Sequence, residues 1–91
     1  MDEQMSLEEI RESLGSFKFG VPIDIFCAKQ GGPITATIVG KDRSTGTLDR
    51  VFLAAGKLEI LPCPGNSPSW FLKIPEQMPL KVLSVKAEQE S

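Results

Sequence analysis

Glycine and proline divide most of this chain into short segments, and this division constrains the fold more than any other feature. The 91 residues include eight Gly and seven Pro. Beyond Gly20, turn-forming clusters recur at 30–33, 40–46, 55–57 and 62–69. The segments between these clusters are four to nine residues long, which is the usual length of strands and too short for independent helices.

The residues within these segments alternate between apolar and polar side chains in the manner of half-buried strands. Ile23, Ile25 and Cys27 occupy alternate positions of one segment, and Ile34, Ala36 and Ile38 do so in the next. The expected strands are 21–29, 34–39, 47–54, 58–61, 70–74 and 80–86. Short strands at close spacing predict a mainly β fold, namely a small SH3-like, Sm-like or OB-like antiparallel barrel of five or six strands, or else a two-layer sandwich.

The N-terminal region is the exception, because its apolar residues follow a helical period. Ser6-Leu7-Glu8-Glu9 matches a capping box, in which the Ser6 side chain and the Glu9 side chain each bond the other residue's backbone amide. Gly15 is placed for a left-handed C-terminal cap. An apolar stripe follows the same segment: Leu7, Ile10 and Leu14.

These patterns predict one domain in four parts. Residues 1–5 are expected to be a flexible N-terminus and 6–15 the helix. Residues 20–86 form the β-barrel domain, and 87–91 are expected to be a disordered tail.

The composition argues against catalysis and metal binding. The chain has no His, which removes the commonest general base and zinc ligand. Cys27 and Cys63 form no CxxC pair, so we expect buried reduced thiols; a redox pair or an intersubunit disulfide is the alternative. We therefore predict that the protein is not an enzyme and that it needs neither a cofactor nor a metal.

Charge and hydropathy also limit the partners. The first 20 residues carry five acids and two bases, whereas the rest is close to neutral, so a strong nucleic-acid footprint is absent. The sequence shows no signal peptide and no apolar run of membrane-spanning length. We expect a cytoplasmic protein that does not bind membranes.

A polar segment between the second and third expected strands is the main candidate for a binding site. Its cations suit a phosphate or carboxylate, and its hydroxyls add donors. The alternative is a solvated hairpin whose charges pair locally. The candidate residues in and near this segment are Lys41, Arg43, Ser44, Arg50 and Lys57.

Parts of this region resemble the motifs of two known families. Residues 34–42 resemble the first half of an Sm-like motif, although Gly46 stands where the RNA-contacting Asn belongs and no Arg-Gly pair follows. Residues 42–46 resemble the D-x-S-x-x-G signature of PilZ cyclic-dinucleotide modules, one residue short and without the upstream pair of arginines. We assign the chain to neither family.

Trp70, which follows a proline-rich loop, is a further candidate because an exposed Trp supplies a large contact area; the alternative is a core position.

Taken together, the sequence predicts a small non-catalytic interaction or adaptor module that binds another protein or itself. The alternative is a barrel that binds a nucleotide or RNA through the region from Lys41 to Arg50.

Overall fold

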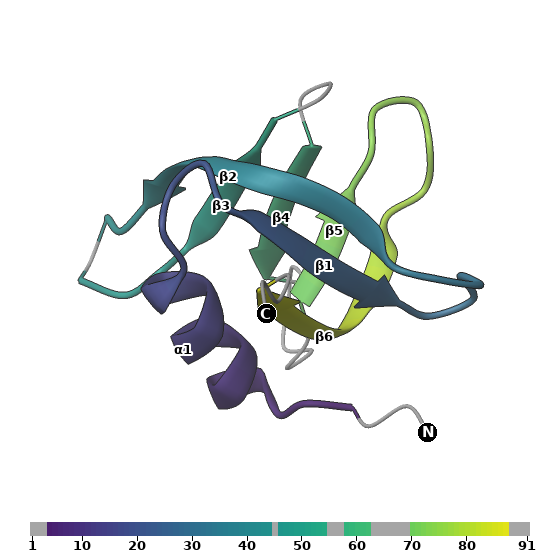
Figure 1. The fold of residues 1–91 in the computed structure, drawn as a ribbon, viewed down its shortest axis with the longest axis horizontal. Helices are drawn as coiled ribbons and strands as arrows, with labels where there is room; N and C mark the ends of the chain where they lie inside the picture. The colour runs from purple at the N-terminus through teal and green to yellow at the C-terminus, as the bar shows by residue number, and fades with distance from the viewer. Residues whose placement is uncertain (1–3, 45, 55–57, 63–69, 88–91) are drawn as a thin grey trace.

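The structure is a computed structural model that describes residues 4–44, 46–54, 58–62 and 70–87. These ranges contain one helix followed by strands (Figure 1). The elements are α1 (Leu7–Ser16), β1 (Pro22–Cys27), β2 (Ile34–Asp42), β3 (Arg50–Leu53), β4 (Leu58–Pro62), β5 (Trp70–Lys73) and β6 (Leu80–Ala87).

All strand pairs are antiparallel, and the strands are hydrogen-bonded in sequence order, β1-β2-β3-β4-β5-β6. The last strand also pairs with the first, with Asp24 opposite Lys86 and Ile25 opposite Val85. The predicted class, mainly β with one N-terminal helix and an antiparallel sheet, is confirmed.

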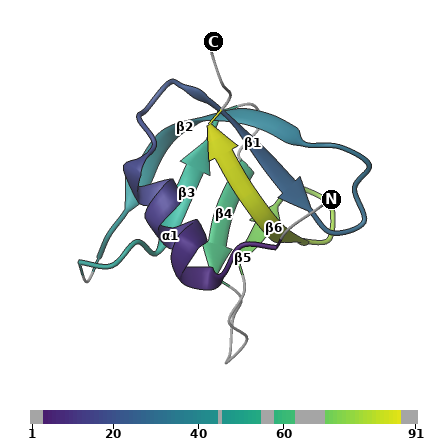
Figure 2. The ribbon, with the colours of Figure 1, turned by 60° about the horizontal axis from the view of Figure 1, so that its bottom comes forward.

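The core lies inside the strands and is closed on one side by α1, which packs against β6 (Figure 2). Ile10 and Leu14, two members of the predicted helical stripe, are buried. This burial supplies the stability that a ten-residue helix lacks by itself. The strands contribute alternate side chains to the same core, among them Ile23, Ile25, Ile38, Val51, Ile60, Trp70, Leu72 and Val85.

Two strands contain a β-bulge, a place where one extra residue interrupts the pairing. In β2, Ile38 lies opposite Leu53 and Gly40 opposite Phe52, which leaves Val39 unpaired. In β6, Leu83 is the extra residue, because Phe26 lies opposite Ser84 and Cys27 opposite Val82. Bulges redirect side chains and backbone groups, and both of these lie at surfaces considered below.

The helix begins as expected and ends differently. The side chains of Ser6 and Glu9 form the full capping box. The prediction that Gly15 ends the helix as a left-handed cap is wrong, because α1 continues to Ser16 and Phe17 is an extended C-cap. Side chains from β2 and the residue after it bond the helix-end carbonyls instead, as described below.

Other boundaries also differ from the expected ones. β2 continues past Val39 to Asp42, so Lys41 belongs to a strand rather than to a loop. The third strand is shorter than 47–54 and begins at Arg50. Ala87 pairs with Ile23 as part of β6. In the part of the chain that the structure describes, no helix has the length and apolar character needed to cross a membrane.

Candidate functional site

Two of the predicted binding cations hold the end of α1. The Lys41 Nζ donates hydrogen bonds to the carbonyl oxygens of Gly15 at 3.0 Å and Phe17 at 2.7 Å. The Arg43 Nη2 donates to the same Gly15 oxygen at 3.3 Å. Because the last carbonyls of a helix lack intrahelical partners and carry partial negative charge, cations stabilise this end.

The environment of Lys41 disfavours its charge. Partial burial and then the nearby Arg43 guanidinium lower the pKa of Lys41. The ammonium also lies 5.3 Å from the ring centre of Phe19, a cation–π distance. Two carbonyls and a ring therefore already surround this ammonium on the protein side.

The rest of the predicted segment is also engaged internally. The Ser44 amide donates to Asp49 Oδ2 at 3.2 Å, and its hydroxyl donates to the same oxygen. Arg50 Nε lies 3.9 Å from Asp42 Oδ2, and its guanidinium carbon lies 6.0 Å from the ring centre of Phe52. The Arg50 side chain is 49% exposed, which leaves it partly available to a ligand.

Trp70 belongs to the core, so the hypothesis of an exposed Trp70 surface is wrong. Its side chain is completely buried. The guanidinium carbon of Arg11 lies 5.6 Å from the Trp70 ring centre, and among the described residues the indole N–H has no hydrogen-bond partner. Lys57, the remaining candidate, lies outside the described residues, as does Cys63.

Exposed apolar side chains gather at a place that the sequence did not single out. Phe19 is 61% exposed, Val39 is 59% exposed, and Val21 is also exposed. The Gly20 amide donates to the Ile38 carbonyl at 3.0 Å, which places 19–21 beside the bulged part of β2. We call Phe19, Val21 and Val39 the Phe19–Val39 surface. The alternation along β2 already placed Val39 on the outer face, and this was the available signal.

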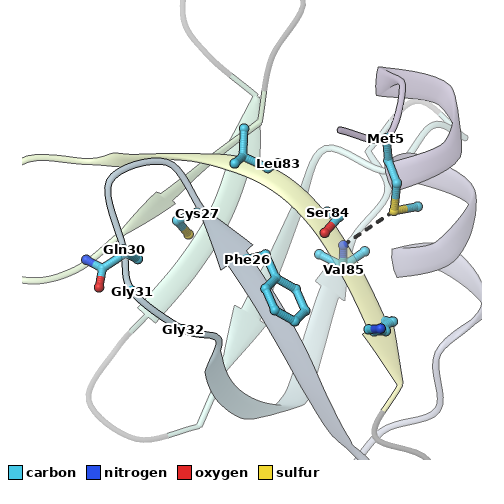
Figure 3. A pocket seen from close by; sticks show the side chains of 10 residues that line it. Met5, Phe26, Cys27, Gln30, Gly31, Gly32, Leu83, Ser84 and Val85 are labelled. Atoms are coloured by element: carbon cyan, nitrogen blue, oxygen red, sulfur yellow. Dashed lines mark hydrogen bonds between the residues drawn. The ribbon is translucent and has the colours of Figure 1, made fainter. Parts of the chain in front are cut away.

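A hollow of about 420 Å³ lies at the other end of β1, where the β1–β2 turn meets β6 (Figure 3). We call it the β1–β6 hollow. Phe26 and Lys86 line it from neighbouring strands, and Gly31 and Gly32 line it from the turn. Met5 also lines it, and its thioether accepts a hydrogen bond from the Val85 amide at 3.5 Å. None of these residues belongs to the site predicted from the sequence.

Cys27 lines this hollow and is unreactive. Cys27 is a free thiol that is only 4% exposed, and burial raises its pKa to about 11. It is therefore neutral at physiological pH and a poor nucleophile. Across residues 4–44, 46–54, 58–62 and 70–87, no three His, Cys, Asp or Glu side chains converge to hold a metal ion.

Comparison with known proteins finds no relative of this chain. No protein family, no curated protein and no solved structure matches this chain. Any conclusion about its function therefore rests on the geometry of its own residues.

Proposed function

We propose that this chain is a small, non-catalytic, cytoplasmic β-barrel module, of the SH3-like, Sm-like or OB-like kind, that associates with a second copy of itself. The Phe19–Val39 surface is the contact. The observation that carries this proposal is the exposure of Phe19 and Val39, two apolar residues whose backbones are held side by side by the hydrogen bond from the Gly20 amide to the Ile38 carbonyl.

Burial of these side chains supplies the driving force. Removing a Val or Phe side chain fully from water contributes about 1.5–3 kcal/mol. Since each of the two is roughly three-fifths exposed, a symmetric contact that covers both copies buries four such side chains. A small central cluster of this kind commonly provides most of the binding energy of an interface.

The charges near this surface favour a second copy as the partner. Exposed cations adjoin it at Lys18 and Arg43, whereas α1 presents exposed acids at Glu8, Glu9 and Glu12. In a two-fold pairing each acidic helix face can meet the basic rim of the other copy, because isologous contacts are self-complementary. Opposite charges at the rim speed association and make it sensitive to salt.

Sedimentation velocity of the full chain over a wide concentration range tests this proposal. We expect a reversible shift from monomer to dimer that weakens at high salt. Val39→Ser should weaken the association at least tenfold, while Met78→Ser, which changes a still more exposed apolar residue in the β5–β6 loop, should leave it unchanged. A wild-type chain that stays monomeric up to millimolar concentration would refute the proposal, as would equal effects of the two variants.

A second candidate function is nucleotide or RNA binding through the region from Lys41 to Arg50. The arrangement that favours it is the half-exposed Arg50 guanidinium over Phe52, since cations beside aromatic rings suit single-stranded nucleic acids. Ser44 and Lys57 are the other residues proposed for it, whereas Trp70 is buried in the core and takes no part.

Salt-dependent titration of the chain with an oligonucleotide tests this candidate. Replacing Arg43 and Arg50 with Ala should weaken binding and reduce the salt slope by about 0.7 for each lost contact with a single strand. A titration that the double variant leaves unchanged, or an absence of binding at low salt, rules the candidate out.

A further inference from the structure

We infer that the β1–β6 hollow binds a small monocarboxylate that carries an apolar body. This site is independent of the Phe19–Val39 surface, because the two lie at opposite ends of β1. The inference rests on three features that meet in the hollow: an apolar wall, one ammonium group, and a turn with two consecutive glycines.

The apolar wall comes from three separate parts of the chain. Phe26 is on the outer face of β1, Leu83 is the bulged residue of β6, and Met5 precedes α1. Figure 3 shows them around the same hollow, with Met5 reaching it from the side of α1. The Met5 amide donates to the Leu83 carbonyl at 2.9 Å, and the Val85 amide donates to the Met5 sulfur. These two bonds fix Met5 in place, so the wall is preformed, as in most small-ligand sites.

Lys86 supplies the positive charge. Its ammonium nitrogen lies 5.7 Å from the centre of the Phe26 ring, so the ring holds the cation at the rim of the apolar wall. Asp24 is directly opposite Lys86 in the strand pairing. Its carboxylate accepts a hydrogen bond from the Thr35 hydroxyl at 2.7 Å, and it forms no ion pair with Lys86 among the described residues. The ammonium therefore remains available to an external anion.

The turn between β1 and β2 offers access and donors. Gly31 and Gly32 are exposed, and a Cβ added to either would meet no atom within 4 Å. Within the described ranges, neither glycine amide donates a hydrogen bond. The amides of Gly31 and Gly32 are thus available as donors to a ligand in the hollow, and the Ser84 hydroxyl is a further donor in the lining.

Among the described residues that line the hollow, Lys86 carries the only charge, which favours an anion, and the size of the site selects a small one. The Ala28 amide donates to the Lys81 carbonyl at 2.8 Å, which places Lys29 close to Lys81 at this same end of the sheet. Cys27 adds no negative charge, because its thiol is protonated. A volume of about 420 Å³ accommodates a ligand with a short aliphatic or aromatic body. One ammonium group balances the single charge of a monocarboxylate but not the charge of about −1.5 to −2 on a phosphate group.

Amide chemical-shift titration of the full-length chain with hexanoate tests the inference. Hexanol, which is neutral, and hexylamine, which is positively charged, are the comparison probes of the same carbon-chain length. We expect hexanoate to shift the amides of 26, 30–32 and 83–86. Hexanol should bind about two- to fivefold more weakly and hexylamine more weakly still, because an exposed ion pair has a modest strength. The same spectra report whether each variant is folded.

Lys86→Gln should weaken hexanoate binding about two- to fivefold and abolish its advantage over hexanol. Lys73→Gln, which removes another exposed lysine that does not line the hollow, should change neither. Equal binding of hexanoate and hexanol to the wild type overturns the inference. So do shifts confined to other parts of the chain, an absence of shifts at millimolar hexanoate, and equal effects of the two lysine variants.

Discussion

Removal of the Lys41 ammonium should detach the C-terminal end of α1 from the strands. Lys41→Met keeps most of the aliphatic side chain and deletes both donors to Gly15 and Phe17. Hydrogen bonds to charged groups contribute about 1.5–3 kcal/mol each. The contribution here is smaller, since water can reach the freed carbonyls at the helix end and burial of the ammonium has a cost of its own, as the lowered pKa of Lys41 indicates. We expect a loss of about 2 kcal/mol in the free energy of unfolding.

Urea denaturation followed by the fluorescence of Trp70, the only Trp in the chain, measures this loss. With a denaturant slope of about 1–1.5 kcal/mol per molar urea for a domain of this size, the midpoint should fall by about 1.3–2 M. Lys73→Met is the control, because an exposed strand lysine changes stability by about 0.5 kcal/mol or less. Equal midpoints for the Lys41 and Lys73 variants would show that the contacts at the helix end contribute nothing.

Three further perturbations test separate parts of the fold. Because the pKa of Cys27 is raised from 9.0 to about 11, the folded state retains the thiol proton while the unfolded chain loses it. The wild type should therefore lose about 2–3 kcal/mol of stability relative to Cys27→Ala between about pH 9 and 11; parallel pH profiles would contradict this. Gly40→Ala places a Cβ 3.3 Å from a Phe52 ring carbon and should destabilise by about 1–2 kcal/mol. This destabilisation should be smaller in a Phe52→Leu background. If chemical denaturation shows that the two substitutions change the free energy of unfolding additively, the clash is excluded. Ser6→Ala removes the N-terminal cap of α1 and should cost about 1 kcal/mol in thermal unfolding, whereas a variant as stable as the wild type would mean that the cap is dispensable.

The features predictable from the sequence were local ones. Ser6 and Glu9 are three residues apart, so their capping box needs no tertiary information. The alternation around Ile25 and Ile38 likewise gave strands and their buried faces directly. The errors at the C-terminal end of α1 have a physical cause, because the carbonyl of Gly15 is bonded by Lys41, 26 residues away, and only the docked fold brings the two together.

The surfaces proposed here for binding are non-local for the same reason. The alternation along β2 places Val39 on the outer face, but the bulge there depends on the register between β2 and β3. The neighbourhood of Phe19 depends on the bond from the Gly20 amide to the Ile38 carbonyl. The β1–β6 hollow joins residues near position 5, at 26–32 and at 83–86. These meet only because the last strand pairs with the first. The sequence drew attention to the densest cluster of charges, and in the structure most of these charges stabilise the fold.

A concentration series of amide correlation spectra, from micromolar to millimolar protein, tests most directly whether the Phe19–Val39 surface mediates self-association. The account predicts concentration-dependent shifts at residues 19–21 and 38–40 that disappear in Val39→Ser and persist in Met78→Ser. Spectra that do not change with concentration, or changes confined to other strands, would contradict it.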